Sequence, residues 1–167
     1  MPPPEIPHGP GRDPPALTVI IPVRDARDTL GEALESAAAQ GFPELELLVV
    51  DDGSTDGSAD VVAACAPHAR VFRHATSRGP AAARNTALRE ARGELIAFLD
   101  ADDVWVPGAL LSLWRCMHEL PQTHFVVGAA EMGRLPERTA AASELVVFHP
   151  ARVSFFLPAT LFRRGVF

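Results

Sequence analysis

The feature that most constrains the fold is the regular alternation of short apolar runs with helical patterns over residues 17–120. The runs at 17–23, 45–50 and 95–99 are rich in Val, Ile and Leu and have the length of buried strands. The segments between them repeat apolar residues on one helical face and end near Gly or Pro. Because parallel strands need long crossovers, this order predicts an α/β fold: a mostly parallel, Rossmann-like sheet with helices on both faces, in three layers.

The same patterns, together with capping and stopping residues, give the expected element boundaries. Helices are expected at 29–40, with Asp28 or Thr29 as the N-terminal cap, and at 57–66, 80–92 and 107–120. Strands are expected at 17–23, 45–50, 70–74, 95–99, 125–129 and 145–148, with 131–143 as a loop and 153–162 as a strand or short helix. Residues 1–15 are rich in Pro and Gly and are expected to form a disordered tail, which leaves 16–167 as a single domain.

Composition excludes several classes of protein. The chain has 167 residues, 47% of them hydrophobic, which is enough for one domain with a core. Its net charge of −6 argues against a nucleic-acid partner, and no apolar stretch approaches the ~20 residues of a membrane-spanning helix. Cys65 and Cys116 have neither disulfide-framework nor metal-ligand spacing, and both lie in apolar helical patterns. We therefore expect both to be buried and the protein to reside in a reducing compartment, the cytoplasm.

Two acidic clusters follow apolar runs, each at the point where a strand is expected to end. Asp51 and Asp52 close one run, and Asp100, Asp102 and Asp103 follow another. The carboxyl ends of parallel strands meet at one edge of the sheet, where open α/β folds bind ligands. The two clusters together therefore predict a site for a metal ion and a nucleotide at this edge.

Three carboxylates within four residues repel one another and favour a hard cation such as Mg²⁺ or Mn²⁺. In an extended backbone Asp100 and Asp102 lie on the same side. The alternative is a solvated acidic turn before the helix expected at 107. The cluster beginning at Asp52 also imitates a calcium loop, but Ala63 stands where a bidentate Glu is needed. A P-loop is excluded because the chain has no Lys.

A small-residue segment at 77–85 lies between the two clusters in the sequence. Its Gly and Ala residues leave room for a flat ring beside the start of a helix. Arg78 and Arg84 are candidates for contacts with a diphosphate, because guanidinium groups pair well with phosphate oxygens. The alternative for each is a surface or structural arginine.

Four motifs, taken together and in this order, resemble the family 2 glycosyltransferases of the GT-A fold. They are Val-Ile-Ile-Pro-Val-Arg-Asp at 19–25, Val-Val-Asp-Asp-Gly-Ser-Thr-Asp at 49–56, Gly-Pro-Ala-Ala-Ala-Arg-Asn at 79–85 and Phe-Leu-Asp-Ala-Asp-Asp at 98–103. The last is similar to the metal-binding Asp-x-Asp motif of that family. The resemblance is strong from residue 17 to about residue 120 and weak beyond.

The resemblance implies a nucleotide-sugar site, with Asp51 and Asp52 at the base (commonly uracil) and Asp100 near the ribose. The implied binding residues are Pro22, Val23, Asp51, Asp52, Arg78, Arg84, Asp100 and Ala101. The resemblance further implies that Asp102 holds Mn²⁺ or Mg²⁺, with Asp100 or Asp103 as alternative ligands. The implied reaction is transfer of a sugar, with inversion, from a UDP-sugar to a hydroxyl of a glycan, lipid or protein acceptor. The implied location is the cytoplasm or the inner face of the membrane.

The chain departs from the family pattern at the catalytic base, which is usually an Asp well beyond the metal motif. No Asp follows Asp103, and the later carboxylates are Glu119, Glu131, Glu137 and Glu144. Of these, Glu131, just after an expected strand, is the best substitute. The catalytic residue is therefore unknown, and the domain is expected to be incomplete at its C-terminal end.

Three other interpretations stay open. The first is a nucleotide-sugar-binding or interaction domain without transfer activity. The second is a phosphatase related to the haloacid dehalogenases, because residues 100–104 imitate the nucleophile motif of that class. That class needs a later Lys, however, and this chain has none. The third is an α/β scaffold without a site.

Overall fold

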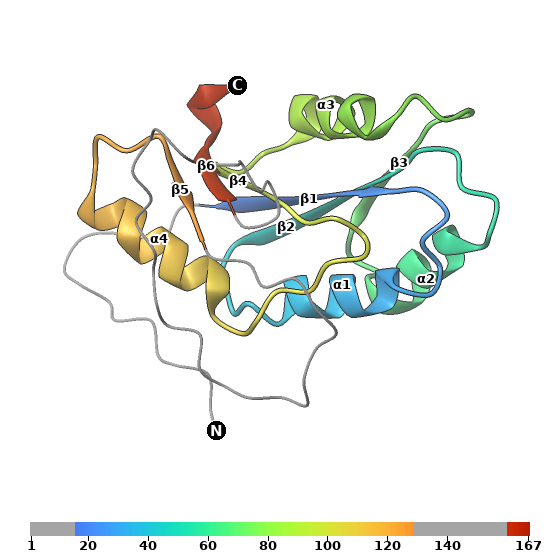
Figure 1. Cartoon of the computed structure of the whole chain (residues 1–167), viewed down its shortest axis with the longest axis horizontal. Coiled ribbons are helices and arrows are strands. Elements are labelled where there is room, and N and C mark those ends of the chain that lie inside the picture. The colour runs from blue at the N-terminus through green and yellow to red at the C-terminus, as the bar shows by residue number, and fades with distance from the viewer. Residues whose placement is uncertain (1–15, 129–159) are drawn as a thin grey trace.

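The computed structural model describes residues 16–128 and 160–167 and places six strands in one sheet in the order β3-β2-β1-β4-β6-β5 (Figure 1). The first four strands along the chain run parallel to one another: β1 (Leu17–Val23), β2 (Leu45–Asp51), β3 (Arg70–Arg73) and β4 (Leu95–Phe98). The strand β6 (Thr160–Arg163) is antiparallel to both of its neighbours, β4 and β5 (Phe125–Val127). The predicted mostly parallel sheet is confirmed.

Helices cover both faces of this sheet. In Figure 1, α1 (Leu30–Ala38), α2 (Ser58–Cys65) and α4 (Ala109–Glu119) lie below the sheet, and α3 (Pro80–Glu90) lies above it. A short 3₁₀ turn, η2 (Arg164–Val166), follows β6. The three-layer arrangement predicted from the alternation of strands and helices is therefore confirmed.

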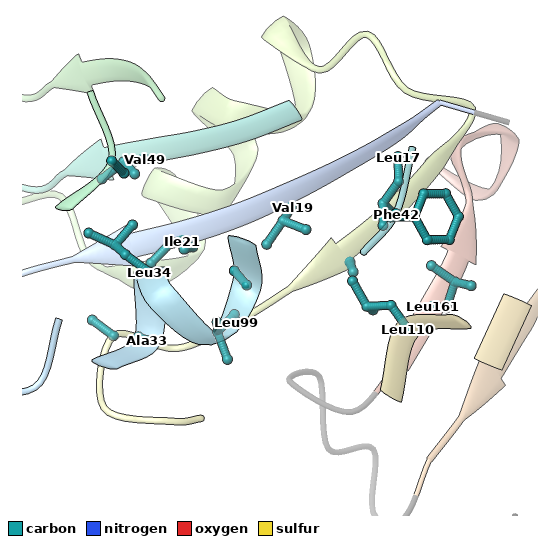
Figure 2. Packing of buried hydrophobic residues seen from close by; sticks show 14 of the residues in the cluster. Leu17, Val19, Ile21, Ala33, Leu34, Phe42, Val49, Leu99, Leu110 and Leu161 are labelled. Atoms are coloured by element: carbon teal, nitrogen blue, oxygen red, sulfur yellow. The ribbon is translucent and has the colours of Figure 1, made fainter. Parts of the chain in front are cut away.

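The central strand β1 separates two hydrophobic cores, because successive side chains of a strand point to opposite faces. Leu17, Val19 and Ile21 pack into the larger core with Leu34 of α1 and Leu110 of α4 (Figure 2). The smaller core lies under α3 and consists of Ile20, Leu48, Val50, Ala83, Ala87, Ala91, Ile96, Phe98 and Phe162. Small alanines on the inner face of α3 let this helix lie close to the sheet.

The register of the strands places the two acidic clusters at one edge. Val23 at the end of β1 pairs with Asp51 at the end of β2, and Ile20 pairs with Phe98 of β4. The chain continues this pairing past both strand ends, since Asp52 N donates to Val23 O (2.8 Å) and Leu99 N donates to Ile20 O (3.0 Å). Both clusters therefore start beside β1, as the parallel-sheet argument predicted.

Several local expectations needed correction. The helices are shorter than predicted, because α1 ends at Ala38 and α3 at Glu90. Thr29 stands at the N-cap of α1 but makes no side-chain cap; its hydroxyl donates to Ala26 O instead. Both cysteines were expected to be buried, but Cys65 is exposed at the end of α2 and Cys116 is half-buried.

The C-terminal expectations can be compared with the structure only in part. The segment predicted as strand or short helix at 153–162 contributes β6, and the strand predicted at 125–129 is β5, which ends at Val127. The tail 1–15, the loop 131–143 with Glu131, and the strand 145–148 lie outside the described residues. Within residues 16–128 and 160–167, no helix has the length and apolar character needed to cross a membrane.

Candidate functional site

A cleft of about 440 Å³ opens at the carboxyl edge of the sheet, between the ends of β1 and β4 and the start of α3. Seven of the residues predicted from the sequence line it: Pro22, Val23, Asp52, Arg84, Asp100, Ala101 and Asp102. These residues come from four separate stretches of the chain. The sheet therefore brings together the groups that the sequence motifs singled out.

The loop after β1 forms one wall of the cleft and is braced against the loop after β2. Asp25 has a φ of 46°, a left-handed conformation that is unusual for a residue with a side chain. Its backbone N–H donates to Ser54 Oγ (3.1 Å), and its carboxylate accepts a hydrogen bond from Thr55 N (2.8 Å). These two contacts hold Asp25 in its unfavourable conformation, so the wall is fixed before any ligand arrives.

Asp52 anchors the opposite wall, the loop that leads into α3. Its buried carboxylate accepts hydrogen bonds from His74 Nδ1 (2.6 Å), Ser77 Oγ (2.7 Å), Arg78 N (2.9 and 3.0 Å) and Gly79 N (2.8 Å). Burial alone raises the pKa of Asp52, but the hydrogen bonds from Ser77, His74 and the two backbone N–H groups outweigh it and lower that pKa below its ordinary value. Asp52 is therefore charged at neutral pH and fixes the loop at 77–79.

His74 extends this anchor to the helix. The His74 ring is buried, and its Nε2 lies 3.0 Å from Thr86 Oγ1 of α3, while Nδ1 contacts Asp52. Ser77 also receives a hydrogen bond from Arg24 at the rim of the cleft. The walls on the two sides of the cleft are thus joined through Ser77.

Asp51 and Arg78 do not line the cleft, and neither does Asp103, the alternative metal ligand. Asp51 is buried, accepts a hydrogen bond from Ser54 N (2.8 Å) and pairs with Arg73 Nε at 3.3 Å. Arg78 is tied to Asp52 through its backbone N–H, and its side chain is exposed. Their contacts with a base and a diphosphate stay predictions.

The acidic loop after β4 forms the floor of the cleft. Arg84 of α3 makes an ion pair with Asp100, and Asp103 N donates to Asp100 O (3.1 Å) in a tight turn. Burial, followed by the charges of Asp100 and Asp102, raises the pKa of Asp103 above its ordinary value. Asp102 lines the cleft and is exposed. Its carboxylate is therefore open to a ligand in the cleft.

This donor set suits a cation that is shared with a substrate. In the described parts of the chain, no three His, Cys, Asp or Glu side chains converge as a metal site would require. Mg²⁺ and Mn²⁺ are commonly held by one or two carboxylates, with phosphate oxygens and water completing the shell. The exposed Asp102 beside Asp100, with repulsion among the three carboxylates, matches that arrangement.

Sequence reasoning missed four residues of the site: Arg24, Asp25, His74 and Ser77. Three of them follow strands in the way that Asp52 does, Arg24 and Asp25 after β1 and His74 after β3. The rule that carboxyl ends of parallel strands carry functional groups would have pointed to them. Ser77 lies within the small-residue segment but could not be paired with Asp52 from spacing alone.

Comparison with known proteins identifies the family. The model of glycosyl transferase family 2 matches residues 18–158. The chain belongs to this family. Succinoglycan biosynthesis protein ExoU of Rhizobium meliloti is 45% identical over 98 residues, which are 56% of this chain and 28% of that protein. The Escherichia coli UDP-Glc:alpha-D-GlcNAc-diphosphoundecaprenol beta-1,3-glucosyltransferase WfaP is 36% identical over 91 residues, 54% of this chain and 36% of that protein. The chain thus spans well under half the length of these curated relatives.

Solved structures of glycosyltransferases share the fold. TarS 1-349 of S. aureus in complex with UDP-GlcNAc aligns with a TM-score of 0.68 and 26% identity over 90% of this chain and 46% of that chain. Mannosyltransferase PcManGT from Pyrobaculum calidifontis, in complex with GDP-Man and Mn²⁺, aligns with a TM-score of 0.63 and 32% identity over 70% of this chain and 36% of that chain. The predicted family and the GT-A fold are therefore confirmed.

Proposed function

We propose that this chain binds the donor of an inverting glycosyltransferase that uses a UDP-sugar and a divalent cation. The observation that carries the proposal is that one cleft is lined by Asp100 and Asp102, by Arg84 and by the end of β1. A nucleoside diphosphate needs these groups: a rigid wall for the base, a cation for the phosphates and acceptors for the ribose. UDP-GlcNAc in TarS and UDP-Glc in the name of WfaP support a UDP-sugar as the donor.

In this proposal the nucleotide lies between the two braced walls. Pro22 and Val23 line the base side, together with the loop that Asp52 anchors. Asp100 would contact the ribose, and Arg84, its ion-pair partner, would contact the diphosphate. Because Arg84 is held by Asp100 beforehand, its guanidinium is already oriented when the phosphates arrive.

Asp102 would hold Mn²⁺ or Mg²⁺, with Asp100 or Asp103 as a further ligand. When bound, the ion would stabilise the negative charge that develops on the departing nucleoside diphosphate. Mn²⁺ in the PcManGT complex supports the choice of a divalent cation. The chain's own contribution is to hold the Asp100 and Asp102 carboxylates in the cleft, with Asp103 beside them in the same turn.

In the transfer itself, the bond between the anomeric carbon and the phosphate oxygen breaks while an acceptor hydroxyl oxygen bonds to that carbon from the opposite face. The hydroxyl proton must go to a base. No described residue is assigned to that role, and Glu131, the sequence-based substitute, lies outside the described residues. The acceptor, a glycan, lipid or protein hydroxyl, and the location in the cytoplasm or at the inner face of the membrane stay predictions.

A second candidate is donor binding without transfer. It is the alternative that the sequence left open, and it differs from the first candidate only in the transfer step. Release of UDP from UDP-glucose or UDP-GlcNAc in the presence of acceptor preparations separates the two candidates. Release above the uncatalysed rate excludes the binding-only domain.

Isothermal titration with UDP, with and without Mn²⁺, tests the donor site. We expect the wild type to bind UDP more tightly with Mn²⁺, and Asp102→Ala to bind with the same affinity whether Mn²⁺ is present or not. Asp60→Ala is the matched control, because Asp60 is exposed on α2 away from the cleft lining. The proposal fails if the wild type does not bind UDP, or if Asp102→Ala retains the full effect of Mn²⁺.

A further inference from the structure

Two buried polar side chains at the end of α1 reach the chain just beyond the acidic loop. Ser36 lies on α1, and Gln40 lies two residues beyond the end of that helix. Their exposed fractions are 8% for Ser36 and 3% for Gln40. Neither lines the cleft. Buried polar groups of this kind are normally retained for the hydrogen bonds that they make, so their partners indicate their role.

Gln40 uses both ends of its amide across a large sequence separation. Its Nε2 donates to Val106 O (3.0 Å) and to Ser36 O (3.1 Å), while its Oε1 accepts from Leu110 N (3.1 Å). Leu110 N belongs to the first turn of α4, where backbone N–H groups have no partner within the helix. Gly108, the N-cap of α4, provides no side-chain cap. Gln40 therefore caps α4 from the turn that follows α1.

Ser36 adds a second link to the same segment. Its hydroxyl donates to Ala33 O (2.8 Å) within α1 and accepts a hydrogen bond from Trp105 N (3.2 Å). With Gln40 it binds the backbone at three points between residues 105 and 110. In Figure 1, α1 and α4 lie on the same side of the sheet, and the chain after β4 passes between them.

These links fix the far end of the acidic loop, whose near end is fixed by Leu99 N on Ile20 O (3.0 Å). Only residues 100–104 lie between the two attachments, and three of them are aspartates. Like charges at such short range push apart, which would widen the loop before a cation arrives. The two supporting side chains are neutral, so they hold the backbone without competing for the cation.

We infer that Gln40 and Ser36 are positioning residues of the cation and diphosphate site, acting through the backbone at 105–110. This inference rests on the proposed function, since it concerns the affinity of that site for its cation. Groups that orient metal ligands from outside the coordination shell typically change metal affinity by about 10- to 100-fold when they are removed. Gln40 makes more of the links than Ser36 and is expected to have the larger effect.

Mn²⁺ binding to the full chain, followed by the electron paramagnetic resonance signal of free Mn²⁺ with saturating UDP, tests the inference. We expect Gln40→Met, which keeps the length of the side chain and removes its hydrogen bonds, to weaken Mn²⁺ binding by about tenfold or more. Ser36→Ala should weaken Mn²⁺ binding by about threefold, since it removes one hydrogen bond. Gln122→Met is the matched control, because Gln122 is exposed, and it should bind as the wild type does.

The affinity for UDP without metal separates positioning from general damage to the fold. It should stay at the wild-type value in both variants, and excess Mn²⁺ should restore full binding. If Gln40→Met does not fold, Ser36→Ala alone decides. Wild-type Mn²⁺ affinity in the folded variants, or an equal loss of metal-free UDP affinity, would overturn the inference. A wild type without Mn²⁺-dependent UDP binding would overturn the proposed function, and the inference with it.

Discussion

Replacing Asp52 by Asn is the most informative test of how the cleft is built. The substitution keeps the shape of the side chain but exchanges one carboxylate oxygen for an amide nitrogen, a donor. In the wild type, Oδ2 accepts hydrogen bonds from Ser77 Oγ (2.7 Å), Gly79 N (2.8 Å) and Arg78 N (3.0 Å). In either orientation, the amide nitrogen faces a backbone N–H donor: Gly79 N at the Oδ2 position, or Arg78 N at the Oδ1 position (2.9 Å).

The expected loss follows from these contacts. Leaving one buried N–H without an acceptor costs about 1–3 kcal/mol, and the hydrogen bonds that remain to the new amide lose the strength that a charged acceptor gives them. We expect Asp52→Asn to lower the free energy of unfolding by about 2–4 kcal/mol in total. For a chain of this length, that corresponds to a decrease in Tm of about 5–15 °C.

Chemical denaturation at several pH values measures this loss and checks its electrostatic origin. The folded state holds the pKa of Asp52 below its ordinary value. The stabilisation is therefore fully present above the unfolded-state pKa of about 3.9 and is lost as the pH falls below it. The difference between wild type and variant should be constant from about pH 7 to pH 5 and should narrow below pH 4.

The control is Asp28→Asn, because Asp28 is exposed and outside the cleft lining. It should leave stability unchanged. A variant at position 52 with the same stability as the wild type at neutral pH would refute the reasoning. Such a result would mean that the loop at 77–79 is not held by this carboxylate.

Two further substitutions test the opposite end of the sheet. Gly93→Ala should lower the free energy of unfolding by about 3 kcal/mol, since an added Cβ would lie 2.5 Å from the backbone nitrogen of Thr18. Gly165→Ala is the control, because there is open space around Gly165. If both variants unfold at the wild-type denaturant concentration, the close packing around Gly93 is contradicted. Glu46→Gln should destabilise by about 1–2 kcal/mol at pH 7, because the carboxylate accepts from Thr18 Oγ1 (2.6 Å) and Arg70 Nη1 (2.6 Å). Burial raises the pKa of Glu46, but these hydrogen bonds outweigh it and lower the pKa overall. The loss of stability in Glu46→Gln should therefore fade below about pH 4. A loss that does not change with pH would contradict an origin in the charged carboxylate.

The fold was predictable where structure depends on local pattern. The runs that became β1, β2 and β4 are apolar and β-branched, and each is separated from the next by a helical pattern. The position of β6 was not predictable in this way. It pairs between β4 and β5 through contacts such as Ile96 with Phe162, which join residues far apart in the sequence. The local sequence at 160–163 does not indicate which strands this segment pairs with.

The same division applies to the site. The rule that ligands bind where parallel strands end finds Asp52, Asp100 and Asp102, because it needs only the order of the strands. It does not find Ser77 or Gln40, whose roles are set by partners 25 and 66 residues away. A polar residue looks alike in sequence whether it is solvated or buried. Its function appears only when the fold supplies a partner, so the groups that hold a site in shape are harder to predict than the groups that face its ligand.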